Sequence, residues 1–183
     1  MTITFLRHAE TDFNKNNLFC GTSDCNITEE GAKLTKNLRN ELPTFDFYYC
    51  SSLKRTSQTL NAIFPDAVPI IDDRIIEICL GVWEGVLKTS VDQNLRKEFK
   101  KGNFAPEGAE SNESVEKRAI SFLNYLFNTY TDNDKILVVT HNGFLRTVAN
   151  LLGIKQISQN LEYFTIDSID YAYSARRFKV LND

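Results

Sequence analysis

The chain shows blocks of apolar residues separated by polar segments, a pattern typical of strands that alternate with helices. Short apolar runs at 3–6, 45–50 and 136–140 predict buried strands. The last run is apolar on both faces, which predicts a central strand with helices on each side. Apolar residues recur at helical spacing between 115 and 130 and predict a long amphipathic helix.

The remaining elements are weaker but keep the alternation. Thr28 precedes two glutamates and predicts a helix start, because a hydroxyl caps the first turn and carboxylates favour its positive end. That helix is expected to run to about Glu41, while 9–27 and 72–111 are expected to be mainly irregular. Further helices are expected at 53–64, around 89–100 and at 143–152, and further strands at 68–71 and, two or three of them, within 162–181. This order predicts a single α/β domain over residues 1–183, a three-layer sandwich with a central, mostly parallel sheet flanked by helices.

Composition and charge exclude several classes of protein. With 42% hydrophobic and 25% charged residues the chain resembles an ordinary soluble domain, and its net charge of −3 argues against nucleic-acid or membrane partners. No run is long enough to cross a bilayer, and no leader peptide is expected before the first strand. The four cysteines lack the spacing of a zinc site; they are Cys20, Cys25, Cys50 and Cys79. We therefore expect a cytoplasmic protein with reduced cysteines.

Chemically active side chains follow three of the predicted strands. Arg7 and His8 follow the first, Arg55 follows the second and His141 follows the third, and the chain holds no other histidine. Each has an ordinary interpretation, such as a solvated rim or a helix cap. In open α/β sheets, however, ligands bind beyond the carboxyl ends of the strands, where helix N-termini also present N–H groups. The coincidence at three strand ends therefore predicts a pocket for a compact anion, most naturally phosphate.

These residue types suit phosphoryl transfer. Guanidinium groups match phosphate oxygens in bidentate fashion and disfavour the protonated form of a histidine between them, which leaves a nucleophilic imidazole. Such an imidazole can accept a phosphoryl group, and its other nitrogen is expected to donate to a backbone carbonyl. A leaving alcohol needs a proton, for which Glu77 is a plausible donor if partial burial keeps it protonated.

Five segments of the chain stand in an order that matches a known family. They are FLRHAETDFN, NNLFCGTSDCNITEEG, SSLKRTSQTL, LGVWEG and VVTHNGFLR. Together they resemble the ordered motifs of the histidine phosphatase superfamily, in its phosphoglycerate mutase-like branch, over nearly the whole chain.

The resemblance implies a role for each matching residue. His8 would be the phosphorylated nucleophile, and Glu77 the proton donor that later activates water. Arg7, Arg55 and His141 would clamp the phosphoryl group. Further substrate contacts would come from the side chain or backbone of Asn14, Cys20, Gly21 and Asn142. The resemblance also implies a reaction without metal or other cofactor, acting on a small phosphorylated metabolite.

The chain departs from the family pattern at three places. Ala9 stands where the family usually has glycine, and we expect that this position does not need positive φ. Cys20 stands where the mutases have threonine. Residues 86–105 are short and carry Arg96 as their only arginine, where the mutases carry an adjacent pair. A shorter cover lets water reach a phosphohistidine, which favours a phosphatase over a mutase.

We therefore expect a phosphomonoesterase that works through a phosphohistidine on His8. A cofactor-dependent phosphoglycerate mutase, a protein phosphohistidine phosphatase with a shallow pocket, and a silent phospho-ligand binding module remain as alternatives. The last is disfavoured because the chain retains His8 and Glu77. Four lysines either contact a second anionic group of the substrate or form a solvated helix face; they are Lys88, Lys97, Lys100 and Lys101. The substrate and the oligomeric state, monomer or dimer, stay open.

Overall fold

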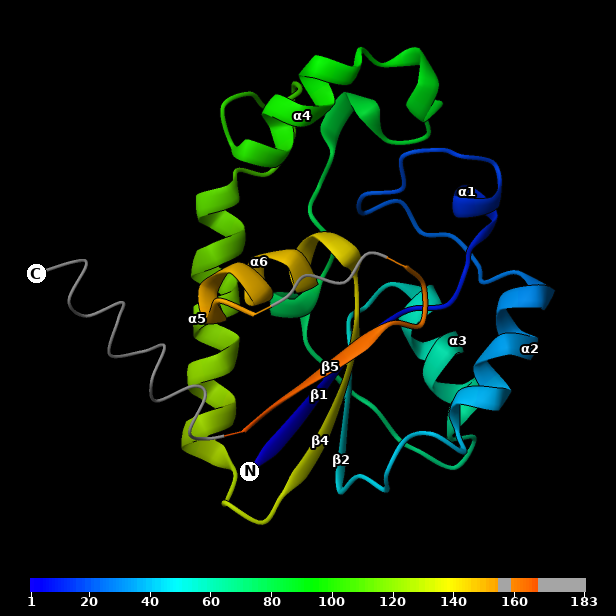
Figure 1. The fold of residues 1–183 in the computed structure, drawn as a ribbon, viewed down its shortest axis with the longest axis vertical. Helices are drawn as coiled ribbons and strands as arrows, with labels where there is room; N and C mark the ends of the chain where they lie inside the picture. Colours follow the sequence, from blue (N-terminus) through cyan, green and yellow to red (C-terminus); the bar gives the residue numbers. More distant parts are fainter. Residues whose placement is uncertain (155–158, 168–183) are drawn as a thin grey trace, which may run out of the picture.

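A five-stranded sheet forms the centre of the protein within residues 1–154 and 159–167, which the computed structural model describes (Figure 1). Its order is β3-β2-β4-β1-β5. The strands are β1 (Thr2–Arg7), β2 (Phe47–Cys50), β3 (Ile70–Ile71), β4 (Lys135–Thr140) and β5 (Tyr163–Asp167). The pairs β1–β4, β2–β4 and β2–β3 are parallel, whereas β5 runs antiparallel to β1. The prediction of a central, mostly parallel sheet is confirmed.

Helices cover both faces of this sheet. The helices of the described residues are α1 (Asp12–Lys15), α2 (Glu29–Leu38), α3 (Lys54–Ile63), α4 (Gln93–Lys101), α5 (Asn112–Thr129) and α6 (Asn142–Leu152), with 3₁₀ turns at Asp73–Ile75, Gly81–Trp83 and Lys88–Ser90. Figure 1 shows α2 and α3 on one side of the sheet and α5 and α6 on the other. The helix α4 lies beyond the end at which β1 and β4 finish. This arrangement is the expected three-layer α/β sandwich.

The strand β4 explains why the sheet has a core on each face. Ile136 and Val138 belong to the apolar cluster that includes α5 and α6, whereas Leu137 and Val139 belong to the cluster that includes α2 and α3. All four side chains are fully buried. Alternate residues of a strand point to opposite faces, so an uninterrupted apolar run is what a two-faced central strand requires.

Several predicted boundaries were wrong by a few residues. The helix expected to reach Glu41 ends at Leu38, and the chain then turns towards Pro43, which disfavours helix in the residue before it. The helix expected around 89–100 begins at Gln93, because the Asp92 carboxylate caps it by accepting from the amides of its first turn.

Two further findings, one difference and one partial agreement, concern segments with little periodic signal. The segment 9–27 contains the one-turn helix α1. The Thr11 hydroxyl caps this helix by accepting from the backbone N–H of Asn14. Of the closing strands expected within 162–181, β5 lies at Tyr163–Asp167, and the rest of that range lies outside the described residues. Within the residues described, no helix is long and apolar enough to cross a membrane.

Candidate active site

A cavity of about 430 Å³ lies at the carboxyl ends of the parallel strands, and α4 contributes to its wall. Eight of the nine site residues predicted from the sequence line it: Arg7, His8, Asn14, Cys20, Gly21, Arg55, Glu77 and Asn142. The ninth, His141, is fully buried, and its ring centroid lies 5.2 Å from that of His8. The strands thus bring these side chains together, as the topological argument predicts.

His8 sits directly after β1 and has one ring nitrogen fixed by the backbone. Its Nδ1 lies 2.7 Å from the carbonyl oxygen of Ala9, and because a carbonyl only accepts, Nδ1 carries the proton. Nε2 is then the unprotonated nitrogen. Burial, followed by the positive charges of Arg55 and Arg7, holds the pKa of His8 well below its usual value, against the opposing bond to Ala9. His8 is therefore a neutral imidazole with the expected tautomer.

Asn160 holds the backbone on which His8 stands. Its Nδ2 donates to the carbonyl oxygens of His8 and Ala9 at 2.9 and 3.1 Å, and it lies 3.2 Å from the Asn14 amide oxygen. Sequence reasoning missed this residue because it precedes the antiparallel strand β5, which no motif connects to the site. Ala9 does not have positive φ, which confirms the expectation that this position does not need it.

Arg55 is fully buried, and its guanidinium is held on three sides. Nε donates to Nδ1 of His141 at 3.1 Å, Nη2 donates to the Gly21 carbonyl at 2.8 Å and Nη1 donates to the Ser23 carbonyl at 2.9 Å. The segment from Cys20 to Cys25 therefore folds around this guanidinium. Such a fixed cation needs no reorganisation when charge develops beside it.

His141 contacts protein groups through both ring nitrogens. Because Nδ1 accepts from Arg55, Nε2 carries the proton and donates to the Ser51 hydroxyl at 2.7 Å. Burial and the charge of Arg55 hold the pKa of His141 well below its usual value. The histidine thus fixes the orientation of Arg55. Its expected direct contact with a phosphoryl group stays a prediction.

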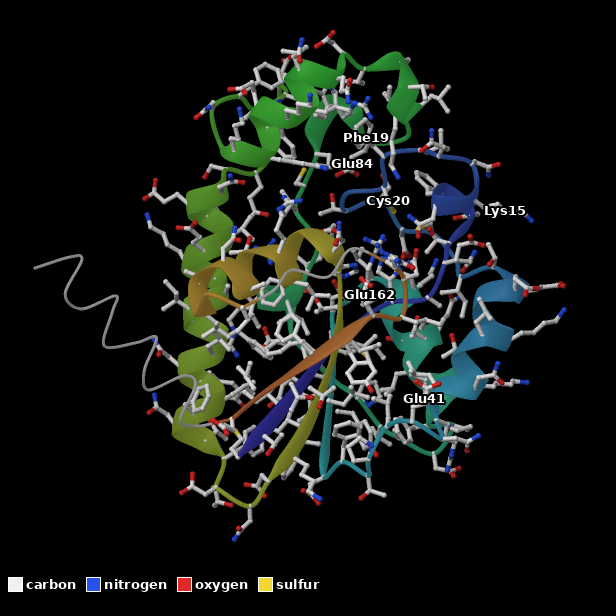
Figure 2. The ribbon with its side chains drawn as sticks, in the orientation of Figure 1. Lys15, Phe19, Cys20, Glu41, Glu84 and Glu162 are labelled. Carbon is white, nitrogen blue, oxygen red and sulfur yellow. The ribbon has the colours of Figure 1, made fainter. Side chains whose placement is uncertain are left out.

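Glu84 anchors the segment that folds around Arg55, and sequence reasoning did not assign it a role. Its carboxylate, labelled in Figure 2, lies in a ring of donors. It accepts from the amide and hydroxyl of Thr22 at 2.8 and 2.9 Å, from the Ser23 hydroxyl at 2.6 Å and from the Leu80 amide at 3.0 Å. Burial alone would raise the pKa of Glu84, but these hydrogen bonds outweigh it and lower the pKa. Gly21 has φ +54°, and any Cβ there would collide with Glu84.

Glu77 lies at the start of α6, where the free amides of the helix point. Its Oε2 accepts from the Gly143 amide at 3.2 Å and its Oε1 accepts from the Ile78 amide at 2.9 Å. A Cβ at position 143 would overlap Glu77, so glycine permits this approach. Arg118 supports the preceding backbone by donating to the Ile76 carbonyl at 2.6 Å. The carboxyl is half-buried and faces the same cavity as His8.

Basic side chains line the part of the cavity formed by α4 and its neighbours. These are Lys88, Arg96, Lys97, Lys100 and Arg146. Burial and the nearby charge of Arg7 lower the pKa of Lys88. Lys101 instead pairs with Glu98 at 2.7 Å on the exposed side of α4. Three of the four lysines picked from the sequence thus face the cavity, and Lys101 does not. No group of three or more metal-binding side chains occurs in the part of the chain that the structure describes.

The two histidines allow a direct test of this electrostatic picture. In buffer free of phosphate and sulfate, we expect the imidazole C2–H signals of both to titrate with midpoints below pH 6.5, because burial and arginines disfavour their charged forms. Proton NMR from about pH 4 to about pH 8, a range that brackets the usual histidine value, measures both midpoints. The His141→Asn variant assigns the two signals. A midpoint at or above 6.5 for either histidine contradicts the buried neutral pair.

The fold and the cavity at its sheet edge define an α/β enzyme of the phosphoglycerate mutase-like type. A family model described as histidine phosphatase superfamily (branch 1) matches residues 3–183. The chain therefore belongs to the histidine phosphatase superfamily, and the resemblance drawn from its five motifs is confirmed.

Individual relatives include both phosphatases and mutases. Phosphoserine phosphatase 1 of Hydrogenobacter thermophilus is 33% identical over 162 residues, which cover 83% of this chain and 76% of that protein. The 2,3-bisphosphoglycerate-dependent phosphoglycerate mutase of Rhizobium etli is 26% identical, over 86% of this chain and 81% of that protein. The crystal structure of phosphoglycerate mutase from Thermus thermophilus matches with a TM-score of 0.78 at 25% identity, covering 92% of this chain and 94% of that one. Family and relatives identify an enzyme of the histidine phosphatase class.

Proposed function

We propose that this protein is a phosphomonoesterase that works through a phosphohistidine on His8. The observation that carries the proposal is the His8 ring itself. It is neutral, its Nδ1 proton is held by the Ala9 carbonyl, and it borders a cavity that Arg7 and Arg55 also line. A buried, unprotonated nitrogen beside two cations is the arrangement that nucleophilic attack on a phosphate ester requires.

The first step transfers the phosphoryl group to the enzyme. The Nε2 lone pair of His8 attacks phosphorus in line, and the bond from phosphorus to the ester oxygen breaks. Glu77 gives its proton to the departing oxygen, so that an alcohol leaves. Arg7 and Arg55 offset the charge that gathers on the phosphoryl oxygens.

The second step releases phosphate and restores the enzyme. Water attacks phosphorus of the phosphohistidine, and the Glu77 carboxylate takes one of its protons. The bond from phosphorus to Nε2 then breaks, which returns His8 to its neutral form and Glu77 to its protonated form. One carboxyl group thus acts first as acid and then as base.

Hydrolysis is favoured over mutase chemistry by the short cover of the site. Residues 86–105 include α4 and four basic side chains that line the cavity, Lys88, Arg96, Lys97 and Lys100, and Arg96 is their only arginine. The relative at 33% identity is called a phosphoserine phosphatase, whereas the mutase from Rhizobium etli is 26% identical. A cavity of about 430 Å³ suits a small metabolite better than a protein surface. We place the reaction in the cytoplasm, where the four free cysteines of the described chain are held as thiols unless an oxidant is present.

The substrate in this proposal carries a second anionic group besides the phosphate. Lys97, Lys100 and Arg146 line the same cavity as His8. Arg96 also lines it, and its buried Nε has no hydrogen-bond partner among the described residues. A carboxylate or second phosphate on the substrate would satisfy this donor and offset the clustered positive charge.

Phosphate release from a matched pair of esters tests the proposal. With a chelator present, we expect the protein to hydrolyse 3-phosphoglycerate at least about 10-fold more efficiently than glycerol 3-phosphate, which lacks the carboxylate. Conversion of 3-phosphoglycerate to its 2-isomer without phosphate release would instead indicate a mutase. If the protein hydrolysed no small ester but released phosphate from a protein that carries phosphohistidine, it would be a protein phosphohistidine phosphatase.

Two neighbouring lysines provide a matched test of the second anionic group. We expect Lys100→Gln to raise the KM for 3-phosphoglycerate by about 10-fold, the scale of one charge-assisted hydrogen bond, and to leave glycerol 3-phosphate unaffected. Lys101→Gln removes the same charge from the far side of α4 and should change neither KM. Equal effects of the two variants would contradict a specific anion contact.

A further inference from the structure

Two cysteines lie side by side on the segment that folds around Arg55. The Sγ atoms of Cys20 and Cys25 are 3.1 Å apart. Cys20 is half-buried and lines the cavity, whereas Cys25 is buried behind it. A small solute in the cavity therefore meets the Cys20 sulfur first and finds a second sulfur in contact with it.

The surroundings of the pair favour a thiolate. Nη1 of Arg55 lies 3.7 Å from the Cys25 sulfur. The hydrogen bond from Cys20 lowers the pKa of Cys25 to about 6. Burial acts in the opposite direction, whereas the charge of Arg55 and the Thr11 hydroxyl lower the pKa further. The same shared proton, with burial, raises the pKa of Cys20. At neutral pH the pair thus holds one proton between two sulfurs, which is the state that reacts with oxidants.

We propose that Cys20 and Cys25 form a reversible redox modification site, which a hydroperoxide converts to a disulfide that closes the loop between them. In the first step, the proton shared by the two sulfurs moves to Cys25, and the Cys20 thiolate attacks one peroxide oxygen. The O–O bond breaks, and the departing hydroxide takes the proton from Cys25 and leaves as water. The Cys25 thiolate then attacks the Cys20 sulfur of this sulfenic acid; the S–S bond forms, the S–O bond breaks and hydroxide leaves. The two sulfurs lose two electrons, and the peroxide gains them.

The disulfide would act on Arg55 through the loop that it closes. Bonding would bring the sulfurs from 3.1 Å to about 2.05 Å and remove the negative charge that faces Nη1. Gly21 and Ser23, whose carbonyls hold the guanidinium, lie between the two cysteines. A displacement of about 1 Å at a catalytic group costs on the order of 10²-fold in rate. Oxidation should therefore reduce the rate of turnover. This effect on the rate rests on the proposed function, whereas formation of the disulfide does not.

Peroxide treatment of the reduced protein tests the site. We expect the wild type to lose two of its four thiols and to regain them with dithiothreitol. Trypsin releases residues 16–33 as one peptide that contains both Cys20 and Cys25 and no other cysteine, and this peptide should become lighter by two hydrogens. Cys25→Ser and Cys20→Ser should each prevent this change, whereas Cys79→Ser should retain it.

The outcomes separate the modification from the activity. A drop in phosphatase rate by about 10-fold or more that dithiothreitol reverses in the wild type and in Cys79→Ser, but is absent in Cys25→Ser, would support the coupling to Arg55. A peptide 16–33 that keeps its mass while other thiols are oxidised would overturn the modification site. A disulfide that leaves the rate unchanged would overturn the coupling. An inactive reduced protein would refute the proposed function, and the peptide mass would still decide on the disulfide.

Discussion

Replacing His8 with asparagine is expected to reduce turnover on every phosphate ester by about 10⁴-fold or more, the scale of removing a catalytic nucleophile. Asparagine is polar and of similar size, but its amide nitrogen has no lone pair available to attack phosphorus. The structure gives no second imidazole in an equivalent state, because both ring nitrogens of His141, the only other histidine of the chain, are engaged by Arg55 and Ser51. Steady-state phosphate release from wild type and variant measures the loss.

A chemical trap distinguishes the loss of a nucleophile from a general loss of structure. The enzyme is mixed with substrate labelled at phosphorus, and the reaction is quenched in base after milliseconds. The wild-type protein should then carry an acid-labile label on the peptide that contains His8. His8→Asn should carry none. His141→Asn serves as the control: it loosens Arg55 and slows turnover, but its label should remain on His8. Label on His141, or undiminished turnover by His8→Asn, would refute the phosphohistidine proposal.

The sequence was sufficient to bring together most residues of the candidate site, because its strongest signals are those of buried strands. A run such as 136–140 can bury its apolar side chains on both faces only in the centre of a sheet. The parallel arrangement of the strands then places the carboxyl ends of the strands at the same edge. Arg7, His8, Arg55 and His141 therefore converge without any knowledge of loops. Glu77, by contrast, lies on an irregular segment that periodicity does not describe, and it was proposed because a leaving alcohol needs a proton donor.

What the sequence did not provide depends on contacts between distant irregular segments. The burial of Arg55 requires carbonyls of Gly21 and Ser23 from a loop without periodic pattern. Asn160 reaches the His8 backbone only because β5 pairs antiparallel with β1, a pairing between segments at opposite ends of the described chain. Glu84 was visible in a motif, but a motif does not state which amides a carboxylate will accept from. The convergence of these side chains at one edge of the sheet was thus predictable, and the contacts that fix their geometry were not.

Glu77→Gln is expected to separate the two steps of the reaction according to the leaving group. An alkoxide needs a proton as it leaves, so kcat on an alkyl phosphate should fall on the order of 10²- to 10⁴-fold, the range for loss of a general acid. A nitrophenolate leaves without one, so the first step with p-nitrophenyl phosphate should be nearly unaffected. Stopped-flow absorbance at the nitrophenolate band, alongside phosphate release from the alkyl ester, measures both.

The same variant should expose the second step. Glutamine cannot accept a proton from water, so the phosphohistidine should accumulate, and p-nitrophenyl phosphate should give a burst of one nitrophenolate per active site before a slow steady rate. Glu84→Gln provides the matched control: it weakens the anchor of the segment that holds Arg55, and should slow both esters alike without a burst. If Glu77→Gln also slowed both esters equally and gave no burst, Glu77 would be a positioning residue, and another group would have to move the proton.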